Sequence, residues 1–342
     1  MPGKKNYSCV ELFAGAGGMA LGLERAGFIP LLLNDSNRNA FATLKINRPQ
    51  WNVVPGSVKE LDLSHLRGKI DLVSGGFPCQ PFSQAGKKLG MDDERGSLFL
   101  DMIRIVDQIK PSVFLMENVK CLLILKNDKT LSIIEHMFND IGYKIVEKSI
   151  YNSKYYKVPQ SRERLIIIGI KKDMKHFDYR NPVSECSRCY TLSDALKAGD
   201  LYDIDVPKSV GYVYNDWKKR YMSLIPAGGN WKCLPVEKQK EYMMKSFYSS
   251  GGKTGIAKRL SWNLPSPTLT CSPSQKMTER CHPDEVRPLT VREYARIQTF
   301  PDSWKFMGSL SERYRQIGNA MPVNMAEAIG KAISKALRNQ SG

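Results

Sequence analysis

Residues 9–26 read CVELFAGAGGMALGLERA, an apolar run that passes through a glycine-rich turn into a segment with helically spaced apolar side chains. A strand followed directly by a helix is the first half of a βαβ unit. In such a turn a ligand can approach the backbone closely and meet the N-terminus of the helix. The pattern Gly15-x-Gly17-x-x-Ala20 fits a loose dinucleotide-binding signature, although tight packing alone also produces glycine-rich turns.

The rest of the first 170 residues repeats this alternation of strand and helix. Further β-rich apolar runs occupy residues 29–33, 70–73, 113–116 and 165–170. Helical spacing covers residues 40–46, 98–109 and 131–141 between them. The alternation predicts an α/β fold with a doubly wound, Rossmann-like parallel sheet covered by helices on both faces. Ligands of such sheets bind at the carboxyl ends of the strands.

The residue composition of the sequence changes at about residue 181. Proline, glycine, serine, tyrosine and lysine then dominate, with no sustained helical or strand period. Amphipathic patterning returns with a helix at residues 289–297, and a second helix at 325–337 closes the chain. We therefore expect residues 1–185 plus 285–342 to form the α/β domain, with the last helix packed back onto it. Residues 186–284 are expected to form a small loop-rich inserted domain.

The composition points to a nucleic-acid partner. The 342 residues include 51 lysines and arginines against 34 acids, a formal charge of +17, and the surplus is spread along the chain rather than gathered in a tail. Such a spread indicates a broad face for a polyanion. No apolar stretch approaches the ~20 residues of a membrane helix, and the first apolar run is too short for a signal peptide. The eight scattered cysteines indicate a reducing cytoplasm rather than a disulfide scaffold.

Polar residues follow the second and third predicted strands. An acid at Asp35 is placed where a ribose diol would be held, although Asp35 or Ser36 could instead cap the next helix. The third strand leads into Pro78-Cys79-Gln80, where a cysteine between a proline and polar residues is placed as a nucleophile would be. Taken alone, Cys79 could equally be a small structural residue.

Two further sets of charged residues belong to the later strands. Glu117 directly follows an apolar run, so its carboxylate should be partly desolvated and suited to proton transfer or to holding a protonated ring nitrogen. Gln160, Arg162 and Arg164 alternate, which places them on one side of an extended segment and suits an anionic or planar polar ligand. Alternatively, Glu117 is simply an exposed acid at the end of a strand, and Gln160, Arg162 and Arg164 form a charged strand edge without a ligand.

Taken in order, these segments resemble the DNA cytosine-5 methyltransferase family, of the bacterial restriction-modification type. The resemblance covers residues 8–170 and 287–335 and rests on the glycine-rich turn, Pro78-Cys79-Gln80, Glu117-Asn118-Val119, Gln160-x-Arg162-x-Arg164 and Gln316-Ile317-Gly318-Asn319-Ala320. It implies an S-adenosylmethionine-dependent methyltransferase sheet with an inserted target-recognition domain. The implied activity is transfer of a methyl group to C5 of a cytosine that is flipped out of double-stranded DNA.

The resemblance also implies roles at the reacting base. The Cys79 thiolate adds to C6, Glu117 binds the N3 and exocyclic amine edge, and Arg164 with Arg162 holds the O2 side. A base, often a water, then removes the C5 proton and the cysteine leaves. Further substrate contacts are expected from Gln80, Ser83 and Gln160, and residues 84–97 are expected to close over the base as a mobile loop.

The implied cofactor is S-adenosyl-L-methionine, which leaves as S-adenosyl-L-homocysteine. The residues that match its site are Phe13, Gly15, Gly17, Gly18, Asp35, Ser57, Pro78 and Asn319. Ser57 stands where the family usually has an acid near the adenine amine, and Ser36 stands where an aromatic residue is often found. We therefore expect weaker or rearranged adenine contacts rather than loss of the cofactor.

The insert is expected to read the DNA sequence through its 250–281 stretch, since polar side chains can reach base edges there. The candidate readers are Lys253, Arg259, Thr268, Thr270, Gln275, Lys276 and Arg280. No metal site is expected, because Cys186-Ser-Arg-Cys189 has no second ligand pair at suitable spacing.

Three rival functions explain less of the sequence. An RNA-directed relative would need its own cysteine signature after Val119, for which Cys121 is the only nearby candidate. A catalytically dead regulator would not need Cys79, and a nicotinamide-dependent dehydrogenase leaves Pro78-Cys79-Gln80 unexplained. The compact length favours a bacterial or phage enzyme. We expect it to be cytoplasmic, associated with the nucleoid through DNA, and monomeric, with a possible cognate restriction endonuclease but no stable complex.

Overall fold

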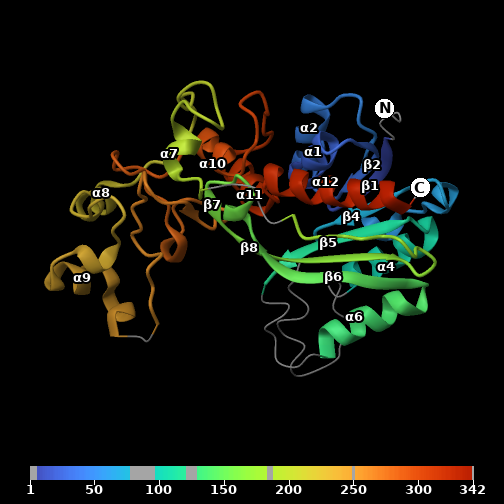
Figure 1. Ribbon diagram of the computed structural model, residues 1–342. Helices are drawn as coiled ribbons and strands as arrows, with labels where there is room; N and C mark the ends of the chain where they lie inside the picture. Colours follow the sequence, from blue (N-terminus) through green and yellow to red (C-terminus); the bar gives the residue numbers. More distant parts are fainter. Residues whose placement is uncertain (1–5, 78–96, 121–128, 183–187, 249–250, 341–342) are drawn as a thin grey trace. The chain divides into compact units, whose positions relative to one another are not determined.

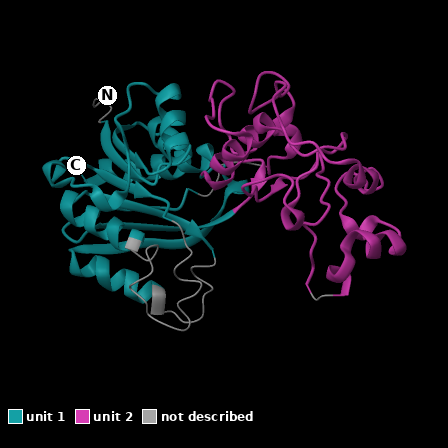
Figure 2. Ribbon diagram, turned by 180° about the vertical axis from the view of Figure 1, so that it is seen from behind, with its two compact units in different colours: residues 1–156, 163–184, 321–342 teal, residues 157–162, 185–320 magenta. Residues whose placement is uncertain are grey.

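The computed structural model describes residues 6–77, 97–120, 129–182, 188–248 and 251–340. The chain divides into two compact units (Figure 2). Unit 1 comprises residues 1–156, 163–184 and 321–342, and unit 2 comprises residues 157–162 and 185–320. The main segment of unit 2 thus begins within one residue of the expected insert but also takes in residues 285–320, because helix Val291–Ile297, expected in the α/β domain, packs against helix Leu192–Leu196 instead.

Unit 1 is built on a seven-stranded sheet in the order β3-β2-β1-β4-β5-β8-β6 (Figure 1). Its strands are β1 (Tyr7–Leu12), β2 (Phe28–Asp35), β3 (Val53–Pro55), β4 (Leu72–Gly75), β5 (Val113–Val119), β6 (Tyr143–Asn152) and β8 (Glu163–Lys171). Strands β1 to β5 are parallel, as the alternating pattern predicts for β1, β2, β4 and β5, whereas the three-residue strand β3 was not predicted. This confirms the α/β class and the doubly wound arrangement.

The expectation of a fully parallel sheet was wrong for β8, which runs antiparallel to both β5 and β6. A parallel return needs a long crossover, usually a helix, and residues 153–162 between β6 and β8 contain only a 3-10 turn and a two-residue strand. Strand β6 was not predicted at all. As an edge strand it carries partly exposed lysines and a glutamate, which hide the apolar alternation.

Helices cover both faces of this sheet (Figure 1). Helices α1 (Gly18–Arg25), α2 (Arg38–Asn47) and α12 (Val323–Gln340) lie on one face, and α4 (Ser97–Ile109) and α6 (Lys129–Asp140) on the other. Close approach of α1 to α12 depends on Gly22, where an added Cβ would lie 2.4 Å from the Ala326 Cβ. Under α4 and α6 a large apolar core includes Ile105, Phe114 and Phe138.

Unit 2 has short elements joined by long irregular segments. It contains helices α7 (Leu192–Leu196), α8 (Asp216–Met222), α9 (Val236–Met243), α10 (Val291–Ile297) and α11 (Leu310–Asn319), and a small sheet of β7 (Gln160–Ser161) and β9 (Ser266–Pro267). The 3-10 turns of the two units are η1 (Val58–Glu60), η2 (Ser64–Leu66), η3 (Ser153–Tyr155), η4 (Trp231–Cys233), η5 (Met244–Tyr248) and η6 (Lys276–Thr278). A separate apolar core, with Tyr221, Trp231 and Met243, lies beneath α8 and α9. In the described ranges, no helix has both the length and the apolarity that crossing a bilayer requires.

Candidate functional site

The glycine-rich turn after β1 forms an open cradle at the carboxyl end of this interior strand. Phe13, Gly15 and Gly17 all have positive φ values, of 57°, 53° and 83°. The left-handed backbone suits glycine at two of these positions and strains Phe13. No described atom lies within 4 Å of the position that a Cβ on Gly15 would take. Helix α1 starts at Gly18 without a side-chain cap, so its first N–H groups face the turn.

Asp35 ties this turn to the end of β2. Its Oδ2 accepts a hydrogen bond from the Gly15 N–H at 2.7 Å, and its Oδ1 accepts one from the Asn37 N–H at 2.8 Å. Burial raises the pKa of the Asp35 carboxyl, and these two bonds offset part of the rise. The alternative of Asp35 or Ser36 as a helix cap was wrong, because Asn37 caps α2. Each Asp35 oxygen keeps a second lone pair that could accept from a diol.

Glu11 is a buried acid of β1 for which no role was expected from the sequence. It is buried in β1, with Ser74 of β4 as its register partner. Among the described residues, Glu11 Oε2 and Ser74 Oγ have no hydrogen-bond partner. Burial, and then the negative charge of Asp35, raises the pKa of Glu11 well above its usual range. A buried acid with an unused oxygen suits a cationic ligand group, and an acid inside the apolar run 9–13 was the available signal.

Ser57 lies in the turn after β3. Its Oγ caps η1 by accepting from the Lys59 N–H at 3.3 Å. The Asn34 amide holds the same turn by donating to the carbonyls of Val54 and Gly56 at 3.0 and 3.1 Å. The glycine-rich turn, the Asp35 carboxylate as a possible acceptor for a diol, and the buried acid Glu11 together fit a cationic nucleoside such as S-adenosylmethionine.

Glu117 and Arg164 meet across β5 and β8. Arg164 Nε lies 2.7 Å from Glu117 Oε1, and the two side chains are 11% and 13% exposed. The other carboxylate oxygen, Oε2, lies 3.1 Å from the position that a Cβ on Gly76 would take. The carboxylate therefore sits directly over the backbone that leads into Phe77, Pro78 and Cys79.

Asn118 holds the next residue of that backbone. Its buried Nδ2 donates to the Phe77 carbonyl at 3.1 Å, and its Oδ1 accepts from the Val119 N–H at 2.8 Å. No role was expected for Asn118 from the sequence, although an amide beside an acid near the end of a buried strand was the available signal. Pro78, Cys79, Gln80, Ser83 and most of the expected closing loop, residues 84–96, lie outside the described residues.

The three alternating residues are divided between the two compact units. Arg164 belongs to unit 1, whereas Gln160 and Arg162 are buried in unit 2. Arg162 donates to the carbonyls of Leu269 and Asn319 at 3.1 and 3.4 Å. Asn319, the last residue of α11, also lies in unit 2, where its Oδ1 accepts from Cys271 Sγ at 3.3 Å.

The predicted readers differ in what their side chains contact. Arg259 and Arg280 are buried and donate to backbone carbonyls, among them those of Pro283 and Thr268. The Lys253 ammonium donates to the Ser246 carbonyl. Thr268 and Thr270 are half-buried, and Thr268 Oγ1 donates to the Ser161 carbonyl. Gln275 and Lys276 are exposed, at the start of η6.

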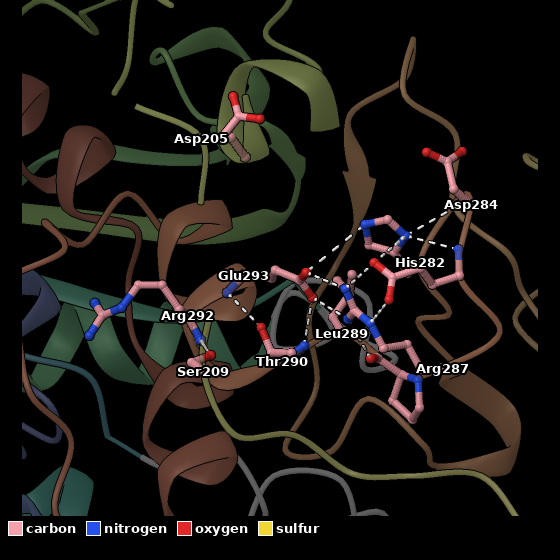
Figure 3. Close-up of polar contacts among 12 residues, drawn as sticks. Asp205, Ser209, His282, Asp284, Arg287, Leu289, Thr290, Arg292 and Glu293 are labelled. Atoms are coloured by element: carbon pink, nitrogen blue, oxygen red, sulfur yellow. Dashed lines mark hydrogen bonds and ion pairs between the residues drawn. The ribbon is translucent and has the colours of Figure 1, made fainter. Parts of the chain in front are cut away.

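A polar cluster of unit 2 lies at the start of α10, beside an open cavity of about 680 Å³ (Figure 3). His282 Nδ1 accepts from the backbone N–H groups of Asp284 and Glu285 at 3.2 and 3.1 Å. Its Nε2 lies 4.0 Å from Glu293 Oε1, and Glu293 pairs with both Nη atoms of Arg287. Burial lowers the pKa of His282, an effect that Glu293 opposes. None of these residues was expected in a functional site from the sequence.

Comparison with known proteins covers nearly the whole chain. Residues 7–335 match the family described as C-5 cytosine-specific DNA methylase. Type II methyltransferase M.PspPI of Psychrobacter sp. (strain TA137) is 58% identical over 334 residues, which are 97% of this chain and 80% of that protein. Type II methyltransferase M.Eco47II of Escherichia coli is 54% identical over 328 residues, 96% of this chain and 78% of that protein.

Solved structures agree in fold. A DNA modification methyltransferase encoded within an E. coli prophage has a TM-score of 0.75 at 24% identity, covering 97% of this chain and 100% of that one. The S. pombe Dnmt2 methyltransferase has a TM-score of 0.66 at 18% identity, covering 97% and 99%. At these identities the likeness concerns the fold alone. The family match and these relatives show that the chain belongs to the C-5 cytosine-specific DNA methylase family and is a DNA cytosine-5 methyltransferase of the restriction-modification type.

Proposed function

We propose that the enzyme methylates a cytosine that it has flipped out of a specific duplex sequence, through a covalent bond between Cys79 and C6 of the base. The contacts made by the end of β5 carry this proposal. The Glu117 carboxylate lies over Gly76, and the Asn118 amide holds the Phe77 carbonyl. The acid and the backbone before the nucleophile therefore share one rigid support.

The reaction needs an electron-rich C5, which free cytosine lacks. Addition of the Cys79 thiolate to C6 breaks the C5–C6 double bond and makes C5 nucleophilic. Glu117 binds the N3 and amine edge and favours protonation at N3 as negative charge develops on the ring. After C5 is methylated, a base removes the C5 proton, the double bond re-forms and the Cys79 sulfur leaves.

Arg164 orients the acid in this scheme. Its Nε is ion-paired with Glu117 and its Nη1 donates to the Glu163 carbonyl at 2.7 Å, so the guanidinium is held from two sides. Held in this way, it fixes the carboxylate and adds positive charge near the O2 side of the base. Positive charge there also favours the thiolate form of a nearby cysteine.

When bound, S-adenosyl-L-methionine supplies an electrophilic methyl group on a sulfonium and becomes S-adenosyl-L-homocysteine. The proposed site is the turn with Phe13, Gly15, Gly17 and Gly18, with Asp35 on the ribose and Glu11 toward the cationic groups. Ser57, Pro78 and Asn319 complete the proposed set. Ser57 can still accept a hydrogen bond from the adenine amine, since a hydroxyl oxygen has acceptor lone pairs.

The proposed division of labour places chemistry in unit 1 and sequence reading in the 186–284 insert. Exposed polar residues of the 250–281 stretch, Gln275 and Lys276 first, would reach base edges, with Lys253, Thr268 and Thr270 beside them. Arg259 and Arg280, whose guanidinium groups contact carbonyls, would support that surface from below. The proposed setting is the bacterial cytoplasm, where the enzyme acts on the nucleoid as a monomer beside a separate restriction endonuclease.

One labelling experiment tests this function. The purified protein is incubated with methyl-tritiated S-adenosylmethionine and either mixed-sequence duplex DNA or total tRNA, with Cys79→Ser as the control. We expect label in DNA that is absent with the variant, and bisulfite sequencing then identifies the modified site. Label in tRNA alone would assign an RNA substrate. If the protein binds DNA but labels neither substrate, the methyltransferase function is rejected and a role as a DNA-binding regulator is indicated.

A further inference from the structure

The backbone of Leu269 is held by two side chains of the Gln160-x-Arg162 segment. The Leu269 N–H donates to Gln160 Oε1 at 2.8 Å, and the Leu269 carbonyl accepts from Arg162 Nη1 at 3.1 Å. Leu269, Gln160 and Arg162 are all buried. Both backbone polar groups of one residue in the proposed reading stretch are therefore satisfied by side chains rather than by backbone groups of another strand.

The orientation of Gln160 is itself determined by Gln298. Gln298 Nε2 donates to the carbonyls of Ile317 and Ala320 at 2.7 and 3.0 Å, so its Oε1 is left to accept. Gln160 Nε2 donates to that oxygen at 2.8 Å, which turns Gln160 Oε1 toward the Leu269 N–H. A flipped Gln160 amide would oppose donor to donor and acceptor to acceptor. Only one arrangement satisfies the whole chain of bonds.

The residues on either side of Leu269 are fixed in the same way. Strand β7 pairs with β9, and Thr268 Oγ1 donates to the Ser161 carbonyl at 2.9 Å. At Gly318 of α11, an added Cβ would lie 2.3 Å from the Thr270 carbonyl oxygen, so the helix end fits against this segment without room for a side chain. Residues 266–270 are therefore held from β7 and from α11 together.

We propose that Gln160 and Arg162 are positioning residues for DNA sequence recognition: they fix the backbone of residues 268–270 so that the proposed reading stretch meets base edges in one geometry. This inference rests on the proposed function, and it replaces the catalytic role that the sequence suggested for Arg162. A hydrogen bond to a base edge tolerates an error of only a few tenths of an ångström. A backbone that shifts would therefore lose discrimination before it loses the reaction itself.

The test compares specificity with turnover. Once the wild-type site is mapped, kcat/KM and the duplex Kd are measured on the cognate duplex and on duplexes with one substituted base pair. Arg162→Lys keeps a positive donor but cannot serve two carbonyls with one planar fork. We expect the ratio of cognate to near-cognate kcat/KM to fall about tenfold, the scale of one well-made base contact. The Kd ratio should fall with it.

A matched control is Arg296→Lys, because Arg296 is also buried in unit 2 and donates to carbonyls of Ala195 and Ile204. It should lower Tm without changing the specificity ratio. A uniform fall of kcat on every duplex with an unchanged Arg162→Lys ratio would restore a catalytic role and overturn the proposal. If Arg162→Lys fails to fold, Gln160→Glu is measured in its place, since it keeps the acceptor for Leu269 but opposes Gln298 Oε1. Loss of folding in both variants would mean a purely structural role and would also overturn it.

These outcomes are separate from those of the proposed function. Wild-type protein that labels no DNA rejects the function itself. Wild-type protein that labels a defined site, with variants that keep its specificity, rejects only the positioning role.

Discussion

Replacing Asn118 by alanine should slow methyl transfer more than it harms folding. The substitution removes the donor to the buried Phe77 carbonyl, a 3.1 Å bond. Leaving a buried carbonyl unsatisfied costs about 1–3 kcal/mol. The bond holds the residue next to Pro78 and Cys79, so much of that cost should appear in the transition state, where the thiolate must meet C6. Each 1.4 kcal/mol is a factor of ten, which predicts a rate about 10- to 100-fold lower.

The assay is a single-turnover measurement with saturating duplex and cofactor, alongside urea unfolding. Tyr143→Phe is the matched control, because Tyr143 Oη donates to the Pro111 carbonyl at 2.6 Å, just before the other end of β5. Tyr143→Phe also leaves a buried carbonyl, that of Pro111, without its donor, but at the end of β5 opposite the one that supports the residues before Cys79. It should lower the free energy of unfolding by a similar amount and leave the rate unchanged. Equal slowing by both variants, or wild-type rates for Asn118→Ala, would refute the reasoning.

Three further substitutions test other parts of the structure. Burial and the charge of Asp35 raise the pKa of Glu11, so this acid ionises only as the pH rises. In calorimetric titrations, wild-type protein should therefore bind S-adenosylmethionine more tightly at higher pH. Glu11→Gln should bind it more weakly and with less dependence on pH. Identical dependence of the S-adenosylmethionine affinity on pH in wild type and Glu11→Gln would exclude a contact between Glu11 and the cofactor. Burial lowers the pKa of His282 (Figure 3), so below about pH 6.5 the unfolded chain binds a proton that the folded chain does not, and the free energy of unfolding falls as the pH drops. His282→Asn keeps an acceptor and removes this effect, so the stability difference between wild type and variant should narrow in acid; a constant difference would contradict the assignment. Gly22→Ala places a Cβ 2.4 Å from that of Ala326 and should destabilise the α1–α12 contact by about 1–3 kcal/mol in urea unfolding, whereas an unchanged midpoint would show that the helices separate freely.

Much of the cofactor side of the site was open to prediction because it is local. The strand, glycine turn and helix of residues 9–26 follow one another without interruption, and Asp35 ends the next strand. In a parallel sheet the carboxyl ends of neighbouring strands meet, so Asp35 was expected beside the turn, and its bond to Gly15 confirms this proximity. Glu11 was missed because its position on an apolar strand suggested no ligand.

The arginines show where sequence reasoning stopped. Alternation grouped Arg162 with Arg164, but the chain passes from unit 2 to unit 1 between them, so their surroundings differ. Arg259 and Arg280 were expected to read bases because arginine side chains can reach base edges, whereas both are buried and donate to carbonyls.

The sequence by itself therefore determined the family, the α/β class, the parallel direction of the early strands and the strand ends that carry Asp35 and Glu117. These depend on spacing between neighbouring residues and on motifs that are read directly. The tertiary structure decided the direction of β8 and the partner of each buried polar group. Those depend on contacts between distant segments, such as that of Arg162 with Leu269, 107 residues further along the chain, which no local pattern records.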